Sequence, residues 1–200
     1  MSGTKPINFY GIGVSKLLQP LLIVLLLAVG LSACGQGRDI HDQLIIAARK
    51  NDVVQVRKLI GKGADVNARE KVVGNGDTAL FHAAAAGYTD IVKLLIEKGA
   101  TVNESPGRTT PLMMASWLGR SDTVQVLVDS GANVNAKDET GATALTDAAR
   151  KGHKDVVQIL VAHGADVNVR LADGNTALSW ATTRGYKDIE AILIHGGAKN

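Results

Sequence analysis

The chain has 200 residues, 46% of them hydrophobic and only 4% aromatic, and a formal net charge of +3 at pH 7. That length suits one ordinary domain or a short array of repeats, and the few aromatic residues favour small-residue helix packing over an aromatic-rich β-sandwich. Two positive charges, Lys5 and Lys16, lie in the leading segment, so the rest carries only +1, which does not indicate a nucleic-acid-binding protein.

The leading segment, residues 1–33, has the pattern of a secretory signal. Lys5 and Lys16 precede an apolar run from Leu21 to Leu31, and small residues follow it. A positive leader, a short apolar stretch and small residues are typical of a signal peptide. Pro20 prevents the run from extending towards the N-terminus, so the run stays shorter than the roughly 20 apolar residues of a membrane-spanning helix. The alternative is an uncleaved anchor with an incidental cysteine.

The end of this segment, Leu31-Ser32-Ala33-Cys34, resembles the lipobox of bacterial lipoproteins. The resemblance implies that Cys34, the only cysteine, is acylated and becomes the new N-terminus, with residues 34–38 as a lipidated tether. Several acyl chains would anchor the protein stably to a membrane. Gly35 stands where an Asp would imply retention in the inner membrane. We therefore expect the inner leaflet of the outer membrane, facing the periplasm.

One pattern recurs with a period of about 33 residues between residues 39 and 200. A Gly-Ala-x-Val-Asn marker begins at Gly63, Gly99, Gly131 and Gly164, and in reduced form at Gly197. A Thr-(Ala/Pro)-Leu marker begins at Thr78, Thr110, Thr143 and Thr176. Two markers with one period indicate a repeat array.

Each repeat predicts a helix, a turn, a second helix and an extended turn. In the last one, Thr176 can cap the first helix and Gly185 interrupts it. Asp188 then lies in the first turn of the second helix, where a negative charge favours the helix dipole. Apolar residues at i, i+3 and i+4 give that helix one buried stripe. The predicted units span about 39–70, 71–103, 104–135, 136–168 and 169–200.

These residues closely resemble the ankyrin repeat over residues 39–200. The resemblance implies an all-α repeat solenoid, a stack of about five helix-turn-helix units with β-turn fingers along one edge. The family's Thr-Pro-Leu-His histidine is replaced by Phe81, Met113, Thr146 and Ser179, which implies that a characteristic internal hydrogen bond is absent. Lys58 and Glu190 replace apolar residues in the first and last units, as expected at the exposed ends of a solenoid.

No catalytic or metal-binding motif is found. The five histidines have no zinc-motif spacing, Ser121 and Ser179 have no glycine elbow, and the recurring acids Asp90, Asp122, Asp155 and Asp188 are explained by helix starts. We expect no enzyme activity, no cofactor and no metal.

The resemblance further implies that a partner protein contacts the concave face of the first helices and the tips of the fingers. On the first helices the candidate residues are Arg49, Lys50, Trp117, Leu118, Arg150, Lys151, Trp180 and Arg184. On the fingers they are Arg69, Asn75, Asp77, Lys137 and Arg170. The basic residues favour an acidic partner, although they also fit an ordinary solvated face.

Two features of this surface leave alternatives open. Trp117 is either an exposed interface anchor, a common role of tryptophan, or packed between neighbouring repeats, and Trp180 allows the same choice. The first finger is three residues longer than those at 136–143 and 169–176. It is either an elaborated contact or a tolerated insertion.

The sequence thus predicts a monomeric, membrane-tethered scaffold that binds protein and not nucleic acid. An immunity protein that neutralises a periplasmic effector is favoured over a lipoprotein that protects an envelope enzyme from stress. The alternatives are an organiser whose basic surface contacts anionic lipid, and a hydrolase with an unrecognised site.

Overall fold

The computed structural model describes residues 39–70, 76–105 and 109–199. The predicted signal peptide, Cys34 with its predicted acylation and tether, and Asn75 of the first finger lie outside the described residues. The chain divides into two units, 1–37 and 38–200, and the fold below is that of the second.

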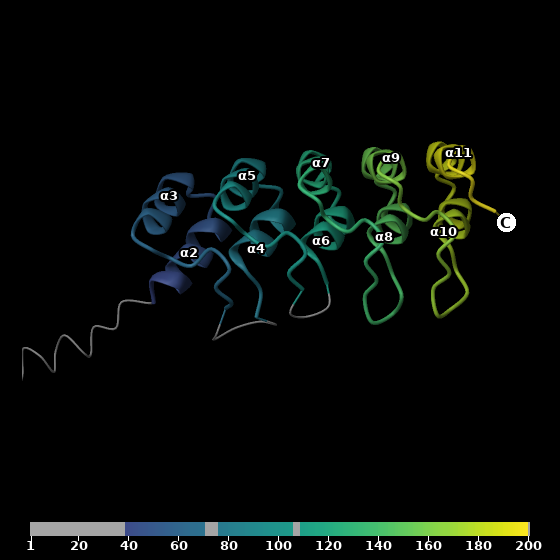
Figure 1. Cartoon of the computed structure of the whole chain (residues 1–200). Coiled ribbons are helices and arrows are strands. Elements are labelled where there is room, and N and C mark those ends of the chain that lie inside the picture. Colours follow the sequence, from purple (N-terminus) through teal and green to yellow (C-terminus); the bar gives the residue numbers. More distant parts are fainter. Residues whose placement is uncertain (1–38, 71–75, 106–108, 200) are drawn as a thin grey trace, which may run out of the picture. The chain divides into compact units, whose positions relative to one another are not determined.

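The described residues contain ten helices and no named strand, arranged as five consecutive pairs (Figure 1). The first helices of the pairs are α2 (Ile40–Arg49), α4 (Ala79–Ala86), α6 (Pro111–Trp117), α8 (Ala144–Lys151) and α10 (Ala177–Arg184). The second helices are α3 (Val53–Gly61), α5 (Thr89–Glu97), α7 (Ser121–Asp129), α9 (Lys154–Ala162) and α11 (Lys187–His195). The all-α repeat solenoid expected from the sequence is confirmed.

Threonines begin four of the first helices, as the repeat pattern predicts. Thr78, Thr110, Thr143 and Thr176 each accept a hydrogen bond from the backbone N–H three residues later. Because a helix leaves its first N–H groups without partners, such a cap stabilises it by about 1 kcal/mol.

The expected loss of an internal hydrogen bond at the family's histidine position is wrong for two repeats. The hydroxyl of Thr146 accepts from the Thr143 N–H at 2.8 Å, and that of Ser179 accepts from the Thr176 N–H at 2.8 Å. A hydroxyl is both donor and acceptor, so it completes a reciprocal capping box that neither Phe81 nor Met113 can form.

The core runs continuously through the stack. Each first helix packs on the next, and each pair packs internally. The leucine of every first helix is buried, as are the apolar residues that face inward from the second helices. Contacts between neighbouring pairs therefore bury the apolar surface that one pair alone would leave exposed.

A ladder of asparagines also joins neighbouring pairs. Asn67, Asn103, Asn135 and Asn168 each donate to a glycine carbonyl of the following repeat, at Gly99, Gly131, Gly164 and Gly197. Each also accepts a backbone N–H two residues beyond that glycine. The repeat marker contains these asparagines, but their bonds across the repeats were not predicted.

The two polar residues that replace apolar ones in the end units differ in exposure. Lys58 is exposed, whereas the Glu190 side chain is only 13% exposed and accepts a hydrogen bond from Lys187 at 2.8 Å.

Within the described residues, no helix is long and apolar enough to cross a membrane.

Candidate functional site

Three consecutive first helices bring two tryptophans to one arginine. Trp117 lies at the end of α6, Arg150 near the end of α8 and Trp180 in the middle of α10, and α8 packs against both neighbours. The Cζ atom of Arg150 is 4.5 Å from the ring centroid of Trp117 and 5.9 Å from that of Trp180. Both distances are within the range of a cation–π interaction.

Two further cations cover the same rings. The Nζ of Lys151 lies 3.8 Å from the Trp117 centroid, and the Cζ of Arg184 lies 5.9 Å from the Trp180 centroid. We call this group, together with Asp147, the tryptophan–arginine cluster: Trp117, Asp147, Arg150, Lys151, Trp180 and Arg184. It spans the third, fourth and fifth helix pairs.

Asp147, on the same helix α8, holds the Arg150 side chain by a hydrogen-bonded ion pair. Its Oδ1 accepts a hydrogen bond from Nη2 of Arg150 at 2.9 Å, and its side chain is only 13% exposed. Burial raises the pKa of the Asp147 carboxyl above its ordinary value, while the charge and hydrogen bond of Arg150 oppose that rise. Sequence reasoning missed Asp147 as a site residue. Its position in the repeat could have revealed it, because a carboxylate stands there where neighbouring repeats carry the apolar Met114 and the aromatic Trp180.

The structure answers the question left open for the tryptophans with an intermediate arrangement. Both side chains are half-buried, covered in part by cations rather than enclosed in the core, and Leu118 beside Trp117 is 39% exposed. The Nε1 atom of Trp180 is shielded from solvent and finds no acceptor among the described residues. Aromatic and basic surface thus remains available next to α8.

The other predicted basic residues do not continue this cluster as one path. Arg49 and Lys50 end α2, and between them and Trp117 lie Ala85 and Ala86 of α4. Nη1 of Arg49 donates to Glu70 at 3.0 Å, and the other oxygen of Glu70 is 3.2 Å from Nε2 of His82. Arg49 is therefore neutralised by the first finger.

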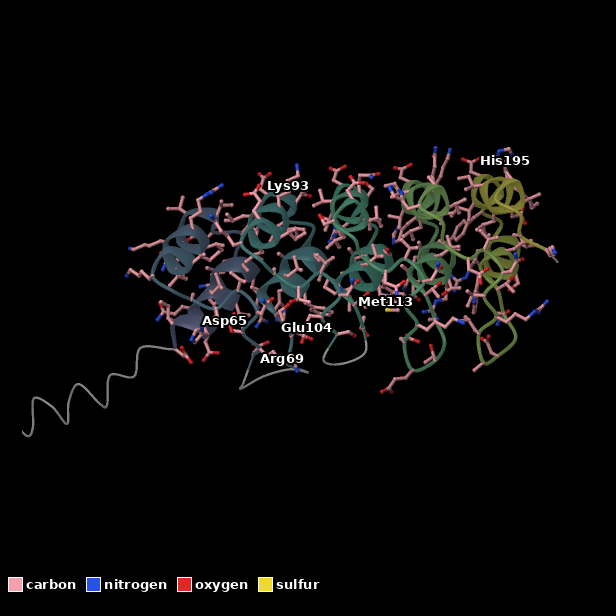
Figure 2. The ribbon with its side chains drawn as sticks, viewed as in Figure 1. Asp65, Arg69, Lys93, Glu104, Met113 and His195 are labelled. Atoms are coloured by element: carbon pink, nitrogen blue, oxygen red, sulfur yellow. The ribbon has the colours of Figure 1, made fainter. Side chains whose placement is uncertain are left out.

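The finger residues are spread along the stack. Arg69 forms an ion pair with Glu104 of the next finger, and both lie on the finger side of the molecule in Figure 2. The carbonyl of Asp77 accepts from the Glu70 N–H at 3.0 Å. Arg170 donates to the carbonyl of Gly174 within its own finger, and Lys137 is exposed.

Three histidines make structural contacts of the kind expected. Nδ1 of His41 accepts from the Asp65 N–H at 2.9 Å, and Nδ1 of His163 lies 2.8 Å from the carbonyl of Ile159. Nε2 of His153 is 3.0 Å from the carbonyl of Trp117, so it links α6 to the next helix pair. The described residues hold no group of three or more His, Cys, Asp or Glu side chains suited to a metal ion.

Comparison with known proteins identifies the repeat. A family model for ankyrin repeats in three copies matches residues 44–138 and 131–200. The chain is 44% identical over 73 residues to the 2-5A-dependent ribonuclease of Mus musculus, across 36% of this chain and 10% of that protein. It is 43% identical over 60 residues to the mitochondrial disaggregase of Bos taurus, across 30% of this chain and 8% of that protein.

A smaller relative is matched over most of its length. An ankyrin repeat protein of Rickettsia felis is 40% identical over 55 residues, which are 28% of this chain and 82% of that protein. The chain thus spans about a tenth of the ribonuclease and of the disaggregase, and their activities do not transfer with the match. Since the family model covers well over half of its residues and the helix pairs stack accordingly, the chain belongs to the ankyrin-repeat family.

Proposed function

We propose that the chain is a protein-binding scaffold whose contact surface is centred on the tryptophan–arginine cluster. The observation that carries this proposal is the contact of Arg150 with both Trp117 and Trp180 on successive first helices. Tryptophan and arginine are the residues most enriched among those that dominate binding energy. Both tryptophans of the chain gather here, next to exposed Leu118.

The geometry also favours binding because it limits the entropy cost. Asp147 and the Trp117 ring restrict the guanidinium of Arg150 before any partner arrives. Immobilising a rotamer-rich side chain costs about 0.5–1.5 kcal/mol on association. A side chain that is already held avoids part of that cost.

We further propose that this scaffold works in a bacterial envelope, where acylated Cys34 tethers it to the periplasmic side of the outer membrane. The lipobox-like segment ending at Cys34 supports the tether. A small tethered binder suits an immunity protein that blocks a periplasmic effector. Protection of an envelope enzyme from stress is the alternative role, and the identity of the partner decides between them.

Purification of the full-length chain from bacterial envelopes tests the binding proposal. The wild type should retain a partner that the Trp117→Ala variant loses, because truncation of a central anchor typically costs about 2 kcal/mol or more. Lys93→Ala is the matched control, since Lys93 is exposed on α5, on the opposite side from the fingers in Figure 2. Equal recovery with all three proteins would refute the proposed surface.

The tether has its own test. Cys34→Ala should abolish metabolic labelling with a fatty acid and leave the precursor uncleaved before residue 34. The same variant should not change the fold of the repeat domain. Normal lipid labelling of that variant would reject the assignment of Cys34.

A further inference from the structure

The charges around the cluster are unbalanced. Arg150, Lys151 and Arg184 are three cations, and Asp147 is the one carboxylate bonded among them. Neighbouring charges are already paired, Lys154 with Asp188 and Lys187 with Glu190. Lys151 and Arg184 form no salt bridge within the described residues, so the cluster itself holds two more cations than carboxylates. Outside it, Asp173 acts electrostatically on Arg150 and Asp138 on Asp147, but neither forms a salt bridge with the cluster within the described residues.

The hydrogen-bonding capacity of Arg150 is also only partly used. A guanidinium has five N–H donors in a rigid planar fork, and the one side-chain bond formed by Arg150 among the described residues goes from Nη2 to Asp147. The side chain remains 34% exposed. The donors that point away from Asp147 are therefore open to an acceptor from outside.

The chemistry of these donors selects a carboxylate. Arginine and a carboxylate match in a two-bond, planar geometry, and such charge-assisted bonds are about twice as strong as neutral ones. Lys151 lies on the same ring as Arg150 and adds a second positive charge to the same place. The exposed apolar side chain of Leu118 borders the cluster, so a short segment with one acidic and one apolar residue fits both features.

From this we infer that the occupant of the tryptophan–arginine cluster is an acidic peptide segment of the partner, whose carboxylate lies on Arg150 and Lys151. The inference rests on the proposed function and gives it a specific chemistry. It places the main contact on the third to fifth helix pairs, where Lys151 and both tryptophans lie beside Arg150.

A displayed library of random dodecapeptides, selected on residues 35–200 of the chain carrying no lipid, tests the inference. Selected peptides should be enriched in Asp and Glu next to an apolar residue. Since the chain has two tryptophans and both lie in the cluster, binding should change its intrinsic fluorescence. Replacing each acidic residue of a selected peptide with its amide should weaken binding by about tenfold or more.

Variants locate the contact. Arg150→Gln should weaken the acidic peptides about tenfold or more, and Arg150→Lys should recover only part of the loss because lysine keeps the charge and loses the fork. Lys93→Gln should change nothing. Since Arg150→Gln leaves Asp147 without its partner and could disturb folding, the exposed Lys151→Gln is measured beside it, with circular dichroism to confirm helix content.

The outcomes separate the two proposals. If selected peptides bind the cluster equally well with carboxylates or with amides, the inference of an acidic segment is overturned, and the proposal of protein binding at this surface stands. Binding to phosphatidylglycerol vesicles that depends on Arg150, without selection of acidic peptides, would overturn both in favour of a lipid contact. No selected peptide at all would refute the acidic segment, and the envelope purification would still decide whether a folded partner binds.

Discussion

Asn103 reaches from one helix pair to the next, where its Nδ2 donates to the carbonyl of Gly131 at 3.1 Å and its Oδ1 accepts the N–H of Asn133 at 2.8 Å. One side chain thereby satisfies two backbone groups of the following repeat. The same pair of bonds recurs at Asn67, Asn135 and Asn168.

Removing this link should weaken the stack. Asn103→Ala should lower the free energy of unfolding in urea by about 2 kcal/mol, because each lost hydrogen bond contributes about 1 kcal/mol. Asn133→Ala is the control, since its side chain accepts one bond, from the Asn135 N–H within the same repeat. It should cost no more than about 1 kcal/mol. Equal losses for the two variants would mean that the hydrogen bonds between repeats contribute no more to the free energy of unfolding than a bond within one repeat.

Two glycines at equivalent turns separate backbone strain from crowding. Gly152 and Gly185 both end a first helix with positive φ, at 80° and 72°. A Cβ at Gly152 would lie 2.8 Å from Cζ of Tyr186, whereas at Gly185 it would meet nothing within 4 Å. Both alanine variants should lose about 1–2 kcal/mol to the left-handed backbone.

Gly152→Ala should lose at least about 1 kcal/mol more than Gly185→Ala, because added atoms in a packed site cost about 1–3 kcal/mol. Thermal unfolding of the two variants gives the comparison. The double variant Gly152→Ala/Tyr186→Ala lacks the ring that the new Cβ would meet. Its stability, compared with that of Tyr186→Ala alone, should therefore fall only by the about 1–2 kcal/mol expected for the left-handed backbone. If the two glycine variants are equally stable, the Tyr186 ring moves aside at no cost and its close approach to Gly152 does not contribute to stability.

The contact of Lys151 with Trp117 is measurable without any partner. In a double-mutant cycle of Trp117→Ala and Lys151→Ala, the coupling free energy should be about 0.5–1 kcal/mol, the usual range for an exposed cation–π pair. Trp117→Ala with Arg184→Ala is the control cycle, because Arg184 lies over the other ring. A coupling near zero in the first cycle would show that Lys151 rests on the indole without stabilising it.

The raised pKa of Asp147 predicts a pH dependence of stability with a definite sign. The folded state holds this proton more tightly than the unfolded state, whose carboxyl has the ordinary pKa of 3.8. The resulting stability is fully present below pH 3.8 and is lost as the pH rises through the folded-state pKa. The stability of the wild type minus that of Asp147→Asn should therefore fall as the pH rises above 3.8.

Asp173 provides a control of opposite sign. Hydrogen bonds from Asn175 lower the pKa of its carboxyl below 3.8, so its contribution is present above pH 3.8 and is lost as the pH falls through the lowered value. The stability of the wild type minus that of Asp173→Asn should rise with pH. Urea unfolding between pH 3 and 6 compares the two differences, and the same slope for both would contradict these assignments.

Much of the fold followed from the sequence, because the repeat period and the capping threonines are local signals. Trp117 and Trp180 were both candidate contact residues, but their shared contact with Arg150 was not predicted. It depends on how successive helix pairs are rotated and spaced, which residue numbers do not give. Asp147 lies three residues before Arg150 on the same helix, a spacing at which side chains meet, so its pairing with Arg150 could have been predicted and only its place beside the two tryptophans could not.

Ion pairs and hydroxyls account for the remaining differences. Arg49 and Arg69 were predicted as contact residues, yet each forms an ion pair with a finger glutamate. Finger conformation decides such pairing, and the turn sequences do not specify it. The bonds of Thr146 and Ser179 were not expected from the loss of the histidine. Each hydroxyl accepts from the N–H of the capping threonine and donates to the carbonyl of that threonine.

The asparagine ladder has a consequence for how this array can change in length. Every link starts from an asparagine in one helix pair and ends on backbone atoms of the next, and those backbone atoms are present whatever the side chains are. A duplicated unit would therefore carry its own connector and offer a complete receiving site to the unit before it. Insertion of a whole copy between α5 and α6 would leave every asparagine junction closed and keep α6, α8 and α10 adjacent, so the array could be lengthened without disturbing the tryptophan–arginine cluster.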